Sequence, residues 1–341
     1  MAKKVSGADY GAAVSKLKIH GPERLYLIWG EEDYLRERFL DELRAAVLGA
    51  GADDFNYKRL EGRALDLRRL SEAVNAVPFL GDRCLVEVRD FDLNGCKDES
   101  FLETLEEIPE TTTVCLVQDV ENPPDGRLGL VKKLKLKAET LEFTAQGQDQ
   151  LAKWIGQRFA RLGKKISRAD AEYLMFTSGT LMSQLIPEIE KLSNYVNSDT
   201  ITRADIDAVA IRLPEARAFE LTAALSARDF DKAAGILSDL LLTKEPPVKL
   251  VFIIGMQYRQ LYAAKLLSPE GRGDVDELCK LIGNRPRFAA ERLFQSARRM
   301  ELRDIRTAVE LCVDCEYRMK SASSSDEALL RELLAHLALG A

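Results

Sequence analysis

The first 145 residues alternate between short apolar runs and longer amphipathic stretches. Five runs rich in Val, Leu, Ile and aromatic residues predict strands, at residues 24–30, 56–62, 83–91, 112–120 and 140–144. Between them, apolar residues recur at helical spacing over residues 34–48, 65–77, 100–108 and 128–136. Because strands alternate with helices, we expect an open, mostly parallel sheet with helices on both faces.

After residue 145 the strand patterns stop and helical spacing continues. Ser167 and Thr202 each precede an acidic residue by three positions, which is the pattern of a capped helix N-terminus. Pro187 falls within the helical stretch between them, where it either kinks a helix or marks its first turn. Pro214 then interrupts the pattern before a larger helical block. We therefore predict an α/β domain followed by two all-α domains, with boundaries at residues 1–145, 146–212 and 213–341.

The composition is that of an ordinary globular protein, with 46% hydrophobic and 30% charged residues. The formal net charge of −6 argues against a stand-alone nucleic-acid binder, which usually carries a basic excess. The longest apolar run, residues 250–256, is far shorter than the ~20 residues that cross a bilayer. No apolar segment follows the two N-terminal lysines, so we predict no signal peptide and expect a cytoplasmic protein without membrane contact.

Neither the cysteines nor the histidines form a recognisable site. Only Cys312 and Cys315 have metal-like spacing, but no second Cys or His pair lies nearby and their surroundings have helical periodicity. We expect them to pack in a core rather than to bind zinc. His20 and His336 are far apart in sequence, and no nucleophile–base pair can be identified. The sequence thus predicts no metal, no cofactor and no catalytic site.

The turn after the first predicted strand lacks the residues of a phosphate-binding loop. Such a loop, GxxxxGK(S/T), uses glycines for close backbone approach, a lysine for the phosphates and Ser or Thr for Mg²⁺. Here Gly30 is followed by Glu31, Glu32 and Asp33. Three carboxylates would repel a polyphosphate, whereas they suit the positive end of a helix dipole. The chain therefore has the organisation of a nucleotide-binding scaffold without its catalytic parts.

Two stretches, residues 127–137 and 153–165, carry Lys and Arg interleaved with apolar positions at helical spacing. They are either the solvated faces of amphipathic helices or surfaces that contact nucleic-acid phosphates without sequence specificity. The sequence leaves both interpretations open.

The stretch NAVPFLGDRCLVEVRD, residues 75–90, places large apolar side chains at a turn before the third predicted strand. Pro78, Phe79 and Leu80 precede Gly81 and Asp82, which are typical turn residues. In one interpretation, Phe79 and Leu80 pack down on the sheet as a cap of the preceding helix. In the other, they project as apolar anchors for the pocket of a partner protein.

The order of these features resembles the delta subunit of the bacterial DNA polymerase III clamp loader. The matching segments are LYLIWGEEDYLRERFLDEL (residues 25–43), LSEAVNAVPFLGDRCLVEVRD (70–90), AFELTAALSARDFDKAAGILSDLL (218–241) and the region of Lys320 and Ser321. The resemblance is distributed over almost the whole chain rather than concentrated in one motif.

The resemblance implies an AAA+-like N-terminal domain without a working ATP site, a small helical lid and a C-terminal domain that joins a pentameric collar. It implies binding of the ring-shaped sliding clamp, the beta subunit, which is held open for loading onto DNA without ATP hydrolysis by this chain. The clamp contact of the family corresponds here to Phe79 and Leu80, preceded by Pro78. The family often has Leu before Phe, so the subsite that each side chain fills stays open.

Further partners that the resemblance implies are the delta-prime and gamma/tau subunits, through the C-terminal domain, and primer-template DNA within the complex. The chain would then have no catalytic site of its own, although it belongs to a DNA-directed DNA polymerase holoenzyme. An atypical AAA+ ATPase is disfavoured by the missing Lys and Ser/Thr, and a nucleic-acid-binding adaptor by the acidic balance. The delta-prime subunit typically carries a zinc-binding cysteine cluster and an SRC motif, and this sequence has neither.

Overall fold

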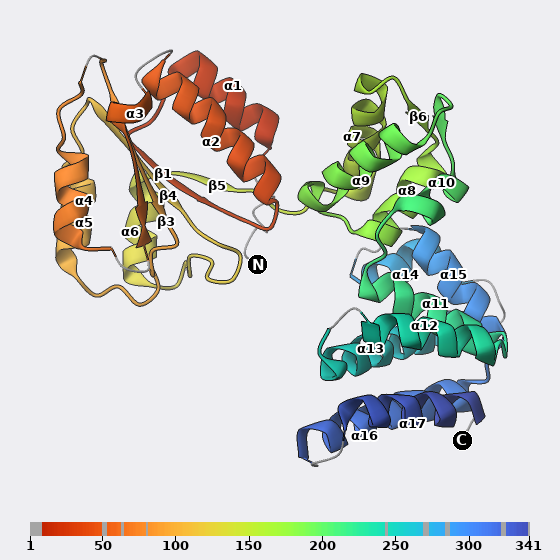
Figure 1. Cartoon of the computed structure of the whole chain (residues 1–341). Coiled ribbons are helices and arrows are strands. Elements are labelled where there is room, and N and C mark those ends of the chain that lie inside the picture. Colours follow the sequence, from red (N-terminus) through yellow and green to blue (C-terminus); the bar gives the residue numbers. More distant parts are fainter. Residues whose placement is uncertain are drawn as a thin grey trace. The chain divides into compact units, whose positions relative to one another are not determined.

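The computed structural model describes residues 9–49, 53–62, 65–79, 81–242, 245–268, 273–283, 287–321 and 325–339 (Figure 1). The chain forms two compact units, residues 1–146 with Leu181–Ser183, and residues 147–180 with 184–341. No helix within the described ranges is long and apolar enough to cross a membrane. Apart from Leu181–Ser183, the expected lid and collar domains fall in the second unit, so the boundary between them near residue 212 stays a prediction.

The first unit contains a five-stranded parallel sheet. Its strands are β1 (Leu25–Trp29), β2 (Tyr57–Glu61), β3 (Cys84–Arg89), β4 (Thr112–Val117) and β5 (Glu139–Glu142). They lie in the order β2–β3–β4–β1–β5. After β1 the chain therefore moves to one edge, returns strand by strand, and finally adds β5 on the other side. All five predicted strands are present.

Helices cover both faces of this sheet (Figure 1). They are α1 (Tyr10–His20), α2 (Asp33–Leu48), α3 (Asp53–Asn56), α4 (Leu67–Val74), α5 (Glu99–Glu106) and α6 (Gly129–Lys137). Apolar residues of α4, α5 and α6 form one core with Leu27 of β1 and Val86 of β3. On the opposite face, the ring of Phe39 from α2 packs against the rings of Tyr26 and Phe143. Neighbouring residues of β1 thus face opposite cores, as the period of two along a strand requires.

Some details of the first unit differ from the prediction, among them the short helix α3, which was not predicted. Helix α1 was not predicted, although the Asp9 carboxylate caps it by accepting the Gly11 and Ala12 N–H groups. Helix α4 ends at Val74 rather than at residue 77. A proline disfavours helical backbone at the residue before it, so Pro78 excludes Val77 from the helix.

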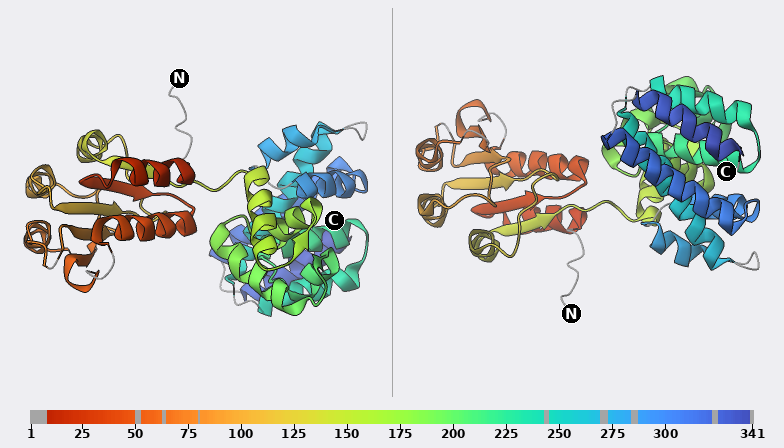
Figure 2. Two further views of the ribbon diagram at one scale, coloured as in Figure 1. Left: turned by 90° about the horizontal axis from the view of Figure 1, so that it is seen from above. Right: turned by 90° about the horizontal axis from the view of Figure 1, so that it is seen from below.

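The second unit is mostly helical. Its helices are α7 (Gln148–Arg161), α8 (Arg168–Ser178), α9 (Met182–Tyr195, which begins in the first unit), α10 (Arg203–Val209), α11 (Pro214–Ser226), α12 (Phe230–Leu242), α13 (Pro247–Leu267), α14 (Val275–Leu281), α15 (Arg287–Arg298), α16 (Leu302–Ser321) and α17 (Asp326–Leu339). Two-residue strands, β6 (Lys165–Ile166) and β7 (Thr200–Ile201), pair in parallel and were not predicted. Figure 2 shows the helices of this unit from two further directions.

The predicted helix caps of the second unit are confirmed. The Asp170 N–H donates to Ser167 Oγ at 3.0 Å at the start of α8. Thr202 and Asp205 form a capping box at the start of α10. Pro187 lies inside α9 rather than in its first turn.

The long helix α13 packs against α16 in the core of the second unit, and α16 lies beside α17 (Figure 1). Cys312 and Cys315 of α16 are 2% and 4% exposed and belong to this core, as predicted. Burial raises the pKa of the Cys312 thiol to about 12, which keeps it protonated at neutral pH. The predicted fold class, an open parallel α/β domain followed by helical domains, is confirmed.

Candidate functional site

The amides of the turn that joins β1 to α2 are already hydrogen-bonded. The Glu32 N–H donates to the Phe143 carbonyl at 2.9 Å, and the Asp33 N–H donates to the Glu31 carbonyl at 3.1 Å. The Tyr34 N–H donates to the Asp33 carboxylate at 2.9 Å. A phosphate-binding loop turns such amides toward the anion. These three amides are therefore engaged within the protein, unlike the amides of such a loop.

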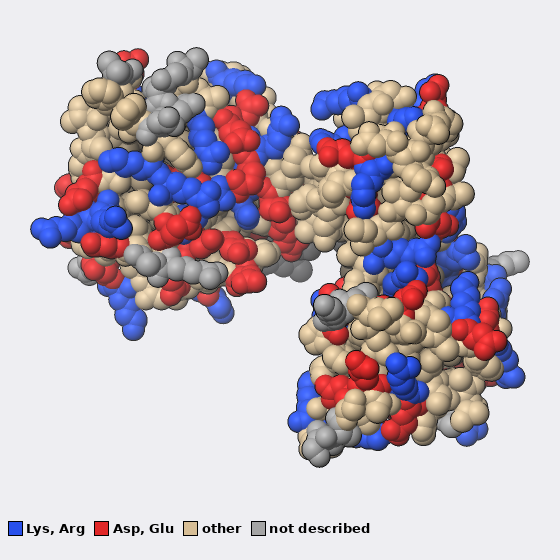
Figure 3. Space-filling model, viewed as in Figure 1, with Lys and Arg blue, Asp and Glu red and all other residues tan. Residues whose placement is uncertain are grey.

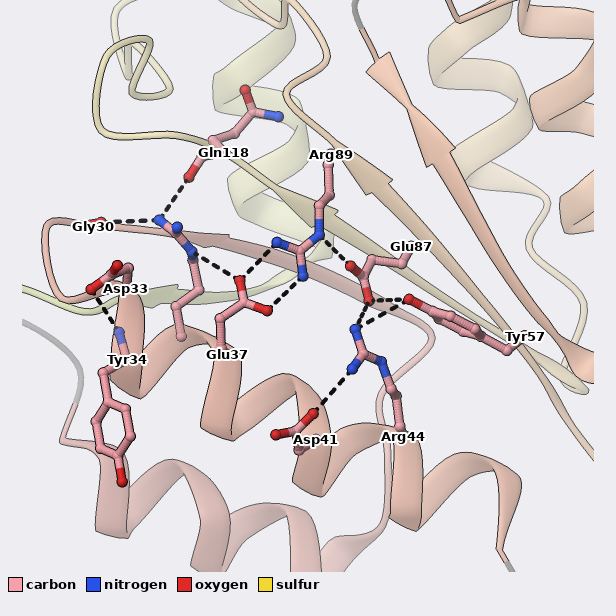
Figure 4. A network of polar contacts seen from close by, with 11 residues as sticks. Gly30, Asp33, Tyr34, Glu37, Asp41, Arg44, Tyr57, Glu87, Arg89 and Gln118 are labelled. Carbon is pink, nitrogen blue, oxygen red and sulfur yellow. Dashed lines mark hydrogen bonds and ion pairs between the residues drawn. The ribbon is translucent and has the colours of Figure 1, made fainter. Parts of the chain in front are cut away.

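Arg36 of α2 lies at the carboxyl edge of the sheet, where open α/β sheets commonly bind ligands. Its Nη1 atom donates to the carbonyls of Gly30 and Gln118 at 3.2 and 3.3 Å (Figure 4). These two residues directly follow β1 and β4, which are neighbours in the sheet. The guanidinium thus joins the ends of the two strands.

A buried ion-pair network continues across the same face of the sheet (Figure 4). The carboxylate of Glu87, which is fully buried on β3, accepts hydrogen bonds from Arg44 at 2.7 Å and from Tyr57 at 2.9 Å. Arg89 also donates to Glu87 and forms a bidentate pair with Glu37, at 2.7 Å for both bonds. Burial raises the pKa of the Glu87 carboxyl, but hydrogen bonds from Arg44 and Arg89 outweigh burial and lower the pKa below its ordinary value. The network holds α2 against β3.

The exposed segment between α4 and β3 contains the residues that the sequence marked as a partner contact. The Phe79 side chain is 55% exposed and Pro78 is half-buried. Leu80 lies outside the described residues. Val77 is 86% exposed and adds a further apolar side chain to the segment. At this exposure the Phe79 ring does not pack down on the sheet as a cap of α4.

Asn56, at the end of α3, holds the backbone of Phe79. Asn56 is 2% exposed, and its Nδ2 atom donates to the Phe79 carbonyl at 2.9 Å. Its Oδ1 atom accepts the Phe79 N–H at 2.7 Å. The ring of Phe55 lies 5.3 Å from the Phe79 ring between centroids and is itself 70% exposed. We call Phe55, Val77 and Phe79 the apolar patch.

Sequence reasoning identified neither Phe55 nor Asn56 as part of this site. Nothing in the spacing of the chain links residue 56 with residue 79. They meet because β2 follows α3 and pairs with β3, so the segments that precede the two strands lie at the same edge of the sheet. The available signal was an isolated Phe beside polar residues just before a predicted strand.

The end of α4 is also attached to the sheet. Thr112 Oγ1 donates to the Val74 carbonyl at 2.9 Å. Two residues further on, the Ala76 carbonyl accepts a weak hydrogen bond from Cys84 Sγ at 3.7 Å. Strands β3 and β4 therefore hold the start of the exposed segment, next to α4, and Asn56 holds it at Phe79.

The two basic stretches make contacts within the protein. In residues 127–137, Lys137 forms a 2.7 Å ion pair with a glutamate of α5, and Lys135 lies over the Trp ring of β1 at 4.6 Å. In residues 153–165, Lys164 donates to two main-chain carbonyls that follow α9, at 2.6 and 2.8 Å. These contacts give the three lysines a structural role, and DNA contact by either stretch stays a prediction.

Comparison with known proteins identifies the family. A family model described as DNA polymerase III, delta subunit, matches residues 26–144. A second, described as DNA polymerase III delta subunit, C-terminal domain, matches residues 215–337. The chain is 25% identical to the DNA polymerase III subunit delta of Bacillus subtilis over 338 residues, which cover 96% of each protein. It is 22% identical to the probable DNA polymerase III subunit delta of Aquifex aeolicus over 287 residues, 78% of this chain and 77% of that one.

Among solved structures, the chain is similar to the Bacillus subtilis DNA clamp loader delta protein, with a TM-score of 0.55 and 23% identity. The match covers 97% of this chain and 100% of that chain, and it shows the shared fold. The two family models describe the same subunit and together span well over half of the chain. This chain, with its open parallel α/β sheet and helical C-terminal region, therefore belongs to the DNA polymerase III delta-subunit family.

Proposed function

We propose that this clamp-loader subunit binds the sliding clamp through Pro78, Phe79 and Leu80 and holds the ring open for loading onto DNA. The observation that carries the proposal is the exposed ring of Phe79, whose backbone N–H and carbonyl are both hydrogen-bonded by the Asn56 side chain. A rigidly held, exposed apolar side chain is the usual anchor of a protein interface, because little conformational freedom is lost on binding.

The apolar patch supplies enough surface for such an anchor. Burying one large apolar side chain in a partner's pocket contributes about 1.5–3 kcal/mol, or roughly tenfold to a hundredfold in affinity. Phe55 and Val77 are 70% and 86% exposed and enlarge the contact around Phe79. Leu80, the next residue in the chain, is proposed as the second anchor.

Ring opening follows from binding rather than from chemistry in this chain. A subunit shifts a closed ring toward the open form only as far as it binds the open form more tightly. The hydrogen-bonded turn amides and the position of Arg36 favour a subunit that does not bind ATP at this sheet edge. We propose that neighbouring subunits bind ATP and thereby expose the Phe79 surface.

The proposed assembly places the helical C-terminal region in a collar with the delta-prime and gamma/tau subunits. Primer-template DNA would lie within the complex, which acts as part of the DNA polymerase III holoenzyme. Its place of action is the cytoplasm, where bacterial chromosomes are replicated.

The test is binding of the cognate sliding clamp to the wild type and to a Phe79→Ala/Leu80→Ala double variant. We expect the double variant to lose about a hundredfold or more in affinity. The matched control is Phe252→Ala, because Phe252 is a similarly exposed aromatic residue, at 50%, on a helix of the second unit. The control should bind the clamp like the wild type. Unchanged affinity in a folded double variant would falsify the site, and a wild type that binds no clamp would contradict the function.

A further inference from the structure

A cleft in the second unit is lined by cations and aromatic rings that the proposed function does not use. Its volume is about 510 Å³, within the range of small-molecule sites. Residues of α8, α10, α11, α12 and α15 line it. Figure 3 shows Lys and Arg side chains gathered across this part of the second unit, between α10 and α12. Five cationic and three acidic side chains line the cleft, although the chain as a whole has a net charge of −6.

One of these cations is neutralised by the protein itself. Arg212 pairs with Asp207 at 2.6 Å and with Glu220 at 3.4 Å. The hydroxyl of Tyr173 also donates to Asp207, at 2.6 Å. Two of the three acidic groups are therefore paired with Arg212, and the third, Asp229, accepts the Lys232 N–H with its Oδ1 atom at 3.2 Å.

The other four cations have no acidic partner among the residues that the structure describes. They are Arg203, Lys232, Arg292 and Arg299. No carboxylate of the described chain lies within ion-pair distance of any of them, whereas Arg158, Arg168 and Arg318 elsewhere in the second unit are each paired with an acidic residue. The cleft therefore carries a local excess of positive charge that the fold leaves uncompensated.

Aromatic rings hold two of these guanidinium groups in place. The Arg203 guanidinium lies over the rings of Tyr173 and Phe288, at 3.8 and 4.6 Å from their centroids. Arg292 lies over the Phe288 ring at 5.3 Å. Stacking fixes the plane of a guanidinium, and its in-plane N–H donors stay available for an anion. The arginines are thus ordered before any ligand arrives, which reduces the entropy lost on binding.

We infer that this cleft binds a small phosphate-bearing molecule, of the size of a nucleotide. Several convergent arginines match the geometry of phosphate oxygens, which they bind bidentately and at close range. Oδ1 of Asp229 already accepts the Lys232 N–H, and its other carboxylate oxygen can accept a donor from the uncharged part of the ligand, such as a sugar hydroxyl. A bounded cleft suits a compact ligand better than a polynucleotide, which needs a groove along its backbone and open rings for base stacking.

The test is isothermal titration of the full-length protein with sodium pyrophosphate and with ATP in magnesium-free buffer. The key variant is Arg292→Glu/Arg299→Glu, because both side chains are exposed and have no acidic partner. We expect the wild type to bind both probes, more weakly as salt is added, and the variant to lose at least about tenfold in affinity. Arg161→Glu/Arg331→Glu makes the same charge change on exposed arginines outside the cleft, and should stay within about twofold of the wild type.

Three results would overturn the inference. They are a wild type that binds neither probe, a key variant that keeps its affinity, and a control variant that loses as much as the key variant. A short oligo(dT) that binds through the cleft more tightly than ATP would also contradict it, because the ligand would then be nucleic acid. If the key variant does not fold, Lys232→Glu tests the same cleft at an exposed side chain on α12. Clamp binding should be unchanged in all these variants, so failure of this inference leaves the proposed function intact.

Discussion

The side-chain amide of Asn56 holds both polar groups of the Phe79 backbone. Oδ1 accepts the Phe79 N–H at 2.7 Å, and Nδ2 donates to the Phe79 carbonyl at 2.9 Å. Asn56 is 2% exposed, so water cannot easily replace these bonds. The buried asparagine thus hydrogen-bonds both the N–H and the carbonyl of one residue in an exposed loop, as a neighbouring strand does in a sheet. The backbone that carries the exposed Phe79 ring is therefore held by a residue that is itself almost fully buried.

The first prediction is that Asn56→Asp weakens clamp binding although it leaves Phe79 in place. The aspartate can accept the Phe79 N–H but cannot donate to its carbonyl. Losing one buried hydrogen bond costs about 1–3 kcal/mol, and we expect clamp affinity to fall about tenfold. Surface plasmon resonance with the cognate clamp measures the affinity, and thermal unfolding measures the cost in stability.

The control for this prediction separates positioning from stability. Val131→Ala removes two buried methyl groups from α6, on the side of the sheet that packs against α4 and α5, and should also destabilise the first unit. It touches neither Asn56 nor Phe79, so its clamp affinity should equal that of the wild type at a temperature where both are folded. Equal losses of affinity in the two variants would show that Asn56 acts through stability alone.

The second prediction concerns Phe55. Phe55→Ala should weaken clamp binding by about tenfold, because the variant removes an exposed ring that lies 5.3 Å from Phe79. Its effect on the free energy of unfolding should be no more than about 0.5 kcal/mol, since the side chain is 70% exposed. Ile19→Ala, at an exposed position of α1, is the control. Wild-type affinity in Phe55→Ala would remove Phe55 from the contact surface.

The regular elements of this fold could be predicted because their signals are local. Short apolar runs and helical spacing are properties of neighbouring residues, and they located the five strands and the change to helical structure after residue 145. Helix α1 was not predicted because Leu17 is its one buried residue, so its apolar residues show little helical periodicity. The end of α4 was misjudged because apolar spacing was given more weight than the effect of Pro78 on Val77.

The site could be predicted only in part, because its geometry depends on contacts between distant segments. The Phe79–Leu80 pair stood out by its composition, and the resemblance to a known family gave it a role. Its exposure did not follow from the sequence, since a buried helix cap has the same composition. The contact with Asn56 spans 23 residues and depends on the pairing of β2 with β3, which no local pattern specifies.

The third prediction is a pH dependence that originates at Glu87. Its pKa is lowered in the folded protein by hydrogen bonds from Arg44 and Arg89 that outweigh burial. Because the pKa is lower in the folded state, the unfolded state takes up a proton more readily in acid. The contribution of Glu87 to the free energy of unfolding is therefore complete above the ordinary carboxyl pKa of about 4.3, and it is lost as the pH falls below that value. Glu87→Gln should therefore destabilise the first unit at pH 7, by about 3 kcal/mol, and by less at pH 4.

Urea unfolding at a series of pH values checks this prediction. Trp29 lies on β1 and reports on the first unit, and Trp154→Phe removes the other tryptophan of the chain. Glu103→Gln is the control, because Glu103 is exposed on α5 and has no ion pair within the described chain. A difference between Glu87→Gln and its parent that stays constant from pH 7 to pH 4 would rule out titration of Glu87 as the cause.

The fourth prediction concerns the close approach of two backbone segments at the turn between β1 and α2. Gly30 has a φ of +130°, and a Cβ atom at this position would lie 2.1 Å from the Phe143 carbonyl oxygen. Phe143 cannot move away easily, because its N–H donates to the Trp29 carbonyl and its carbonyl accepts the Glu32 N–H. Gly30→Ala must therefore either break these bonds or distort β1, and it should destabilise the first unit by about 3 kcal/mol or more.

Gly49→Ala separates this steric effect from backbone strain. Gly49 also has a positive φ, +65°, but nothing lies within 4 Å of the position that its Cβ would take. Gly49→Ala should lower the free energy of unfolding only by the cost of placing an alanine in a left-handed conformation, about 1 kcal/mol. Urea unfolding followed by Trp29 fluorescence compares the two variants in the same unit. If both lose the same stability, contact with Phe143 does not explain the glycine at position 30. A larger loss in Gly30→Ala would instead indicate that the turn is built to pack against the end of β5, in the place where related folds leave room for phosphate.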